Sequence, residues 1–236
     1  MPFQFKQFSV EQDHCAMKIG TDGVLLGAWA PIEHNPFNVL DIGTGTGIIS
    51  LMIAQRSHAE QIDAFEIDED AYEQAVENFE NSPWSDRLFC FHAALDEFME
   101  EPEDEYDLIV SNPPFYTEDY SSGNDQRDLA RFADALPFED LAEAAGFLLS
   151  KNGIFAVILP YKEEEKFIAL VRDFDLFPVK ITRVKGTPTS EIKRSLLAFS
   201  RHYSENFPTD ELVIEISRHN YTPEYIHLTK DFYLKM

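Results

Sequence analysis

The sequence predicts an α/β fold with a mostly parallel central sheet and helices on both faces. Short apolar runs alternate along the chain with segments whose apolar residues recur at helical spacing. This alternation is typical of parallel strands joined by helical crossovers. Two of the apolar runs end in unusual turns, one rich in glycine and one with consecutive prolines. The 236 residues, 44% of them hydrophobic, are enough for one α/β domain of generous size.

The first unusual turn follows the apolar run 39–42. Gly43, Gly45 and Gly47 form a G-x-G-x-G pattern, preceded by Asp41 and followed by an apolar helix-like segment. Glycine lets the backbone adopt positive φ and approach a ligand closely. The dinucleotide fingerprint G-x-G-x-x-G, which serves a pyrophosphate, has a different spacing. The pattern therefore favours a ligand without phosphate, such as a sulfonium cofactor that carries an amino-acid tail.

The next apolar run, 61–66, ends in Glu66. A carboxylate at this strand end can accept hydrogen bonds from both ribose hydroxyls of an adenosyl group. A helix is predicted over 67–80 and a third strand over 87–94. The glycine turn and Glu66, each at a strand's carboxyl end, together indicate a nucleoside-containing cofactor.

A fourth apolar run, 106–111, ends in Asn112, Pro113, Pro114 and Phe115. This turn suits methylation of a conjugated amine, a poor nucleophile because its lone pair is delocalised. The Asn112 side-chain oxygen and the Pro113 carbonyl can each accept one hydrogen of the amine, and Pro114 biases Pro113 away from helical ψ. Phe115 offers a ring face on which a flipped-out base can stack. The alternative is a rigid Pro-Pro turn with a capping Asn.

The remaining elements continue the alternation. The polar segment from Tyr116 to Ala135 is interpreted as a mobile lid, and Arg127 and Arg131 at its far end would contact substrate phosphates or neighbouring acids. The segments that follow are predicted, in order, as a helix, a strand, a helix and two strands: 138–149, 154–159, 162–174, 178–184 and 195–200.

The charge is strongly negative and unevenly distributed. A net charge of −24 argues against a general nucleic-acid binder, because phosphate contacts need Lys and Arg. The stretch from Lys180 to Arg201 is an exception, because it holds six basic residues and the single acid Glu191. A basic loop on an otherwise acidic protein can bind the backbone of a small RNA. The alternative is that these residues are ordinary surface charges. The basic residues are Lys180, Arg183, Lys185, Lys193, Arg194 and Arg201.

Cysteine and histidine content, together with the lack of long apolar runs, also indicates the cellular compartment and argues against a metal site. Cys15 and Cys90 are too few and too far apart for a disulfide framework, so we expect a reducing, cytoplasmic compartment. No apolar run has the length of a membrane span, and the N-terminus does not have the form of a signal peptide. The seven histidines show no i,i+4 pair and no Cys partner, so no metal site is expected.

The glycine turn, Glu66 and the Asn112 turn resemble those of class I S-adenosylmethionine-dependent methyltransferases of the amino-methylating branch, whose motif is N/D-P-P-F/Y/W. Further segments are similar to the bacterial tRNA1(Val) adenine-N6 methyltransferase family, so that the resemblance covers nearly the whole chain. These segments are 5–8, 15–18, 20–30, 126–131 and 221–225. One departure is Ala94, which follows the third strand where the resemblance implies an acid that contacts the adenine of the cofactor.

The resemblance implies a class I methyltransferase (Rossmann-like) fold in a single domain, 1–236, with 1–36 covering the cofactor and 37–236 forming the catalytic core. It implies S-adenosyl-L-methionine as the cofactor, no metal, and N6 of adenine 37 in the anticodon loop of tRNA1(Val) as the acceptor. The implied catalytic residues are Asn112, Pro113, Pro114 and Phe115. The implied cofactor-binding residues are Asp41, Gly43, Gly45, Gly47 and Glu66, with Thr21 and Asp22 closing over the cofactor.

Two other functions remain open at this stage. Glutamine-N5 methylation of a release factor uses an Asn-Pro-Pro-Tyr turn, but here the last residue is Phe115 and only a short segment precedes Asp41. A noncatalytic RNA-binding protein could also retain a relict cofactor pocket, which the intact Asn112 turn disfavours.

Overall fold

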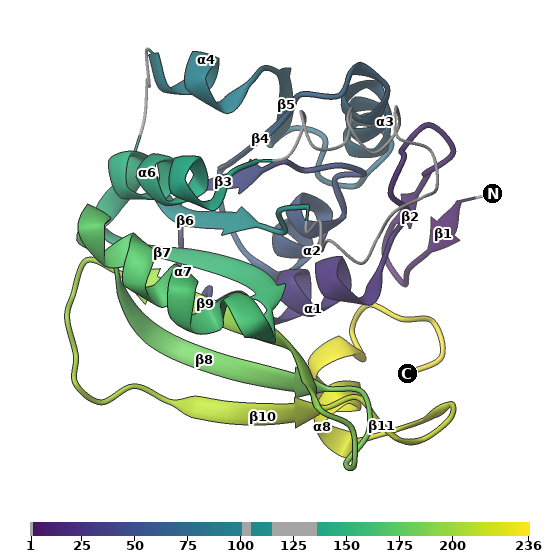
Figure 1. Ribbon diagram of the computed structural model, residues 1–236. Coiled ribbons are helices and arrows are strands. Elements are labelled where there is room, and N and C mark those ends of the chain that lie inside the picture. Colours follow the sequence, from purple (N-terminus) through teal and green to yellow (C-terminus); the bar gives the residue numbers. More distant parts are fainter. Residues whose placement is uncertain (1, 101–104, 115–135) are drawn as a thin grey trace, which may run out of the picture.

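A computed structural model of the chain describes residues 2–100, 105–114 and 136–236 (Figure 1). Its central sheet has the strand order β10-β8-β9-β7-β6-β3-β4-β5. Neighbouring strands are parallel except that β9 is antiparallel to both β7 and β8. The strands are β3 (Asn38–Ile42), β4 (Gln61–Glu66), β5 (Leu88–His92), β6 (Tyr106–Ser111), β7 (Leu149–Pro160), β8 (Phe177–Lys185), β9 (Ile192–Ser200) and β10 (Thr209–Val213).

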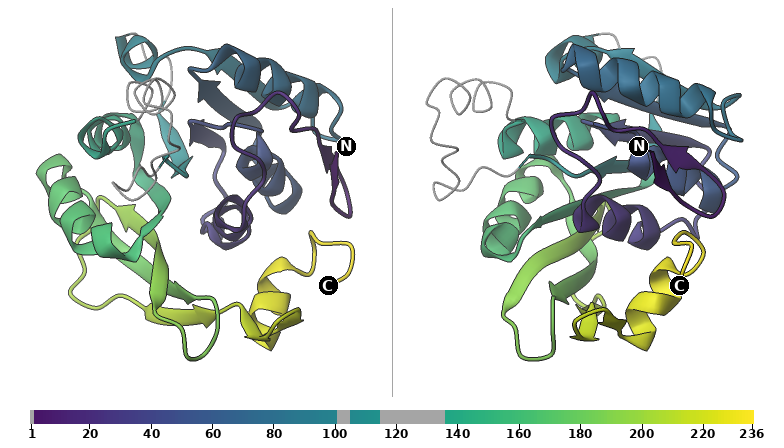
Figure 2. Two further views of the ribbon diagram at one scale, coloured as in Figure 1. Left: turned by 45° about the vertical axis from the view of Figure 1, so that its right-hand side comes forward. Right: turned by 90° about the vertical axis from the view of Figure 1, so that its right-hand side faces the viewer.

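Helices cover both faces of this sheet, as the sequence predicts. On one face α1, α2, α3 and α8 contribute to a hydrophobic core, and on the other face α4, α6 and α7 build a second one. Figure 2 shows the first three helices and the pair α6 and α7 on opposite sides of the strands. The helices are α1 (Thr21–Trp29), α2 (Ile48–Arg56), α3 (Glu69–Glu80), α4 (Leu95–Glu100), α6 (Phe138–Leu148), α7 (Glu164–Val171) and α8 (Pro223–Thr229).

The amino- and carboxyl-terminal segments pack against each other. A small hairpin of β1 (Phe3–Gln4) and β2 (Ser9–Val10) precedes α1, and β11 (Glu215–Ser217) pairs with β12 (Asn220–Tyr221) before α8. The Phe5 ring stacks on Tyr233 with a centroid distance of 5.8 Å, and the Lys6 ammonium donates to the Met236 carbonyl at 3.0 Å. Among the described residues, no helix is long and apolar enough to cross a membrane.

The boundaries differ from the prediction most clearly in β7. The sequence predicts a helix over 138–149, a stop at Asn152-Gly153 and a strand from 154. In the structure α6 ends at Leu148, and β7 begins at Leu149 and shifts register between its pairings with Tyr106 and Leu108. A Cβ on Gly153 would lie 2.8 Å from the Tyr106 carbonyl oxygen. Gly153 is therefore needed for close packing at an irregularity inside the strand and does not terminate the helix.

Candidate active site

The strand register brings three of the predicted site segments to one edge of the sheet. Ile42, at the end of β3, pairs with Phe65 of β4 and with Ser111 of β6. The residues that follow, Gly43, Glu66 and Asn112, therefore leave the sheet side by side. The Ser111 hydroxyl donates to the Ile42 carbonyl at 2.9 Å, and the Gly43 N–H donates to the Phe65 carbonyl at 3.1 Å.

The three glycines of the turn have different surroundings. Gly43, Gly45 and Gly47 all have positive φ, at 70°, 56° and 78°. A Cβ on Gly43 or Gly45 would meet no atom within 4 Å, whereas one on Gly47 would lie 2.5 Å from the Phe79 ring. Gly43 and Gly45 thus border open space that a ligand can enter. Gly47 lets α2 begin close to α3.

Asp41 supports the glycine turn from beneath and is fully buried. Its Oδ2 accepts hydrogen bonds from the hydroxyls of Thr44 and Ser50, both at 2.7 Å. Burial raises the pKa of Asp41 to about 6, although these two hydrogen bonds oppose the shift. Its Oδ1 has no hydrogen-bond donor among the described residues. Buried oxygens are rarely left unpaired, so Asp41 Oδ1 suits a donor group that a ligand or its water would bring.

Glu66 is held by backbone N–H groups from two segments. One carboxylate oxygen accepts from the Gly45 N–H at 2.8 Å, and the other accepts from Ile67 at 3.0 Å and Asp68 at 3.1 Å. Two carboxylate oxygens offer about four acceptor sites, so that capacity remains for a further donor. Glu66 thus joins the glycine turn to β4 and can still accept a hydrogen bond from a bound hydroxyl.

Two residues of α3 that the sequence analysis missed hold the N-terminal segment, and one of them, Asn78, also contacts the glycine turn. The buried Asn78 amide donates to the carbonyls of Glu11 and Thr46, both at 2.9 Å, and its oxygen accepts from the Glu11 N–H at 2.8 Å. The Gln74 oxygen accepts from the His14 N–H at 3.3 Å. Both side chains are buried only because α3 packs against the N-terminal segment, so the sequence carried no local signal for these contacts.

Thr21 and Asp22 lie in the first turn of α1, next to Gly23, where an added Cβ would lie 3.2 Å from the Ile48 side chain at the start of α2. Thr21 is exposed, and the Asp22 carboxylate accepts a hydrogen bond from the Arg194 guanidinium of β9 at 2.8 Å. The structure therefore links Asp22 to the β8–β9 hairpin, and its predicted contact with the cofactor stays a prediction.

The Asn112 turn is described only in part. Asn112 and Pro114 are half-buried and Pro113 is buried. Phe115, the predicted lid and its two arginines, Arg127 and Arg131, lie outside the described residues. The Ala94 N–H, which could replace the missing acid as a partner of the cofactor, donates to the Glu97 carboxylate at 3.1 Å.

The basic stretch forms β8, β9 and their connection, but most of its charges have partners within the molecule. Arg183 pairs with Glu164 at 2.6 Å, and Lys185 pairs with Glu211 at 2.6 Å. Lys180 lies 4.7 Å from the Trp29 ring centroid, and burial lowers its pKa.

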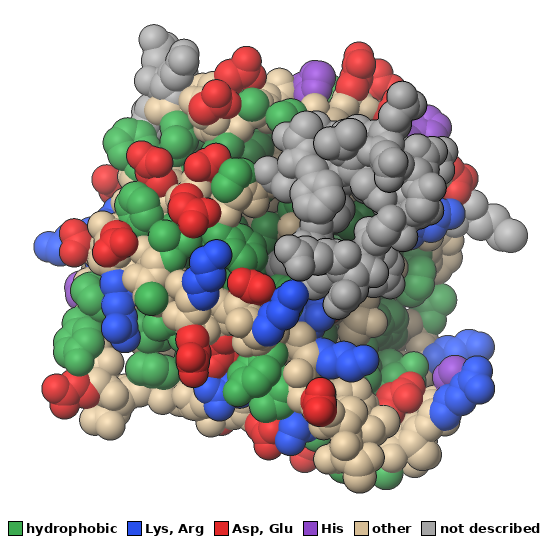
Figure 3. Space-filling model, in the orientation of Figure 1, with side chains coloured by type: hydrophobic (Ala, Val, Ile, Leu, Met, Phe, Trp, Pro, Cys, Tyr) green, Lys and Arg blue, Asp and Glu red, His purple; other side chains and the backbone are tan. Residues whose placement is uncertain are grey.

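Two further cations of the stretch are also engaged. Arg194 binds Asp22, and Arg201 donates to the Leu149 carbonyl at 2.9 Å. Lys193 is exposed and forms no ion pair with any described residue. On the face in Figure 3, Lys and Arg side chains lie mainly in the lower half, towards β8, β9 and the carboxyl-terminal segment.

Comparison with known proteins decides the family. The family model described as "Methyltransferase small domain" matches residues 24–136, which include the glycine turn, Glu66 and Asn112. A Flavobacterium johnsoniae protein named tRNA1(Val) (adenine(37)-N6)-methyltransferase is 76% identical over 234 residues, which are 99% of this chain and 100% of the relative. The chain belongs to the tRNA1(Val) (adenine(37)-N6)-methyltransferase family.

This membership makes the chain an enzyme, as the sequence predicts. The fold agrees with that of solved methyltransferases. A predicted O-methyltransferase from Agrobacterium tumefaciens has a TM-score of 0.69 at 19% identity, with 89% of this chain and 96% of that chain covered. P. horikoshii TYW2, solved in complex with MeSAdo, has a TM-score of 0.58 at 16% identity, with 85% and 71% covered. The predicted class I fold is thereby confirmed.

Proposed function

We propose that the chain transfers a methyl group from S-adenosyl-L-methionine to N6 of adenine 37 in the anticodon loop of tRNA1(Val). The observation that carries the proposal is the register of Ile42 with Phe65 and Ser111, which aligns the glycine turn, Glu66 and Asn112 at one sheet edge. The name of the 76% identical relative supports this acceptor.

The residues at this edge fit the cofactor. S-adenosyl-L-methionine supplies a methyl group on a sulfonium, which is already an activated leaving group, so no metal is required. Gly43 and Gly45 border open space, and Glu66 retains acceptor capacity for a ribose hydroxyl. Asp41 holds the turn through Thr44 and Ser50. We further propose that segment 1–36 covers the cofactor. This segment is held by Asn78 and includes α1, which begins with Thr21 and Asp22.

The proposed chemistry is positioning of a weak nucleophile. The Asn112 side-chain oxygen and the Pro113 carbonyl accept the two N6 hydrogens, while Phe115 stacks on the adenine. S-adenosyl-L-methionine would supply the methyl group: the new bond from N6 to the methyl carbon would replace the bond from that carbon to sulfur, and the proton released from N6 would pass to solvent. Holding the two reacting atoms in line supplies most of the acceleration. Because the adenine lies in a loop, removing it from its stack costs little.

The test is radiolabelled methyl transfer to unmodified tRNA1(Val) and to the same tRNA with adenine 37 changed to guanine. We expect incorporation into the first tRNA only, because guanine has no amine at position 6. Equal incorporation into both tRNAs would overturn the acceptor assignment. Labelling of bulk protein in preference to bulk tRNA would favour the glutamine-N5 alternative, and labelling of neither would favour a noncatalytic protein.

We also propose that the exposed part of the basic stretch contacts the tRNA backbone. Lys193 is the second residue of β9 and lies at the same edge as the carboxyl end of β7, since Pro160 pairs with Arg194. Each lost phosphate contact should make the slope of log affinity against log salt shallower by roughly 0.7–0.9. We therefore expect Lys193→Ala to reduce the slope by about this amount without changing cofactor affinity. The matched control is Lys151→Ala, because Lys151 is exposed near the opposite end of β7. Equal slopes in the two variants would contradict the contact.

A further inference from the structure

β7 extends beyond the level of the Asn112 turn. Ser111 of β6 pairs with Val157 of β7, and β7 continues to Pro160, where η1 (Tyr161–Glu163) begins. At about 3.3 Å per residue, Tyr161 lies roughly 10 Å along the strand direction from the level of Asn112. The end of β7 therefore extends past the proposed acceptor site, and Tyr161 follows directly after it.

The Tyr161 ring is exposed on the surface and supported by a guanidinium. The residue is 39% exposed, and the Arg183 guanidinium carbon lies 5.5 Å from the ring centroid. A cation over an aromatic face is attracted by the negative charge of that face. Arg183 thus covers part of the Tyr161 ring, and the rest of the ring is open to solvent.

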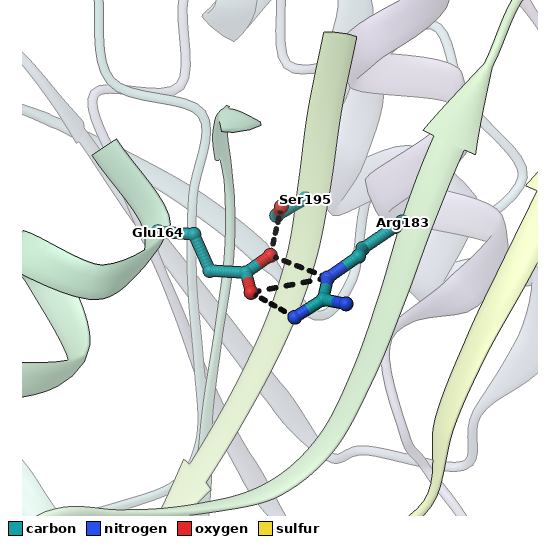
Figure 4. Close-up of polar contacts among 3 residues, drawn as sticks. All are labelled: Glu164, Arg183 and Ser195. Carbon is teal, nitrogen blue, oxygen red and sulfur yellow. Dashed lines mark hydrogen bonds and ion pairs between the residues drawn. The ribbon is translucent and has the colours of Figure 1, made fainter. Parts of the chain in front are cut away.

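Arg183 is itself held rigidly (Figure 4). Its Nη2 and Nε donate to the Glu164 carboxylate at 2.6 Å and 3.1 Å, and Glu164 also accepts from the Ser195 hydroxyl. Glu164 comes from α7, Arg183 from β8 and Ser195 from β9. Three elements therefore determine the orientation of one surface guanidinium.

This arrangement is not explained by stability. Glu164 is only 3% exposed, and the desolvation cost of a buried carboxylate offsets much of the attraction to its partner. The buried Glu164 carboxylate instead fixes the orientation of the partly exposed Arg183 guanidinium. That guanidinium lies against the Tyr161 ring at the surface. The Arg183 Nη1 also has no hydrogen-bond acceptor among the described residues.

We propose that Tyr161, backed by Arg183, is a stacking platform for a base of the anticodon loop next to the methylated adenine. The inference rests on the proposed function. Unpaired RNA bases are characteristically recognised by stacking on aromatic rings and guanidinium planes. The separation from Asn112 is too large for the target adenine itself and suits a neighbouring nucleotide. Stacking needs no net positive charge, which agrees with the pairing of Arg183 to Glu164.

The experiment measures kcat and KM for the tRNA with Tyr161→Ala, Tyr161→Leu and Tyr161→Phe. A lost base–aromatic stack corresponds to about five- to 150-fold in affinity, so we expect the Ala and Leu variants to raise KM about tenfold. Tyr161→Phe keeps the aromatic face and should stay within twofold of wild type. Leu keeps the apolar bulk, so a defect shared by Ala and Leu reports the ring and not a packing loss.

Calorimetry with S-adenosylhomocysteine is the control, and the affinity should be unchanged in all three variants. A tRNA with an abasic site next to adenine 37 should abolish the difference between wild type and Tyr161→Leu. If wild type methylates the tRNA and both truncated variants raise KM less than threefold, the platform is overturned while the proposed function stands. If wild type does not methylate tRNA, the proposed function itself has failed.

Discussion

Asn112→Ala is expected to lower kcat by about 10²–10³ and to leave cofactor affinity nearly intact. A hydrogen bond that strengthens as the amine reacts typically contributes this much to the rate. Asn112 leaves β6 opposite the glycine turn, and the strand end is anchored independently by the Ser111 hydroxyl on the Ile42 carbonyl. Truncating the side chain of Asn112 therefore removes an acceptor from the site without removing that anchor.

Asn112→Asp is the matched comparison, because a carboxylate retains an acceptor oxygen at the same position. We expect this variant to keep more activity than Asn112→Ala in single-turnover methylation of the tRNA. Binding of S-adenosylhomocysteine, measured by calorimetry, should be the same for both. An Ala variant that retains more than a third of the wild-type rate would show that Asn112 is only a structural cap.

The placement of Gly43, Glu66 and Asn112 at strand ends could be predicted because the signals for it lie in the local sequence. A strand followed by glycines, a strand that ends in Glu66 and a strand followed by Asn112 each carry their signal within a few residues. Parallel pairing then brings their carboxyl ends to one edge, which is a general property of this fold class. The register of Ile42 with Phe65 and Ser111 needed only that topology.

Contacts between distant segments could not be predicted in this way. The sequence shows that the stretch around β8 and β9 is basic, but the partners of those cations come from elsewhere in the chain. Arg183 meets Glu164 on α7, and Arg194 meets Asp22 on α1. Likewise, Asn78 lies 67 residues from Glu11 in sequence and still fastens the N-terminal segment to the glycine turn. Such pairings depend on tertiary packing, for which one sequence carries no local signal.

Glu66→Ala should weaken binding of S-adenosylmethionine by about 10²-fold. A hydrogen bond to a charged acceptor contributes about 1.5–3 kcal/mol, and the variant would lose the one to a ribose hydroxyl. It would also release the Gly45, Ile67 and Asp68 N–H groups, which the carboxylate holds at 2.8–3.1 Å. The glycine turn would then lose its tie to β4, so that loss of the ribose contact and loosening of the turn act in the same direction.

The control for this effect is Glu69→Ala, which removes an equal charge from an exposed position in the first turn of α3. Calorimetric titration with S-adenosylmethionine and S-adenosylhomocysteine should show near wild-type affinity for Glu69→Ala and the large loss only for Glu66→Ala. Glu66→Ala affinity within threefold of wild type would refute the ribose assignment. The contrast with Asn112→Ala is informative, because one change should affect cofactor binding and the other turnover. Only a site with separate cofactor and acceptor halves predicts both results.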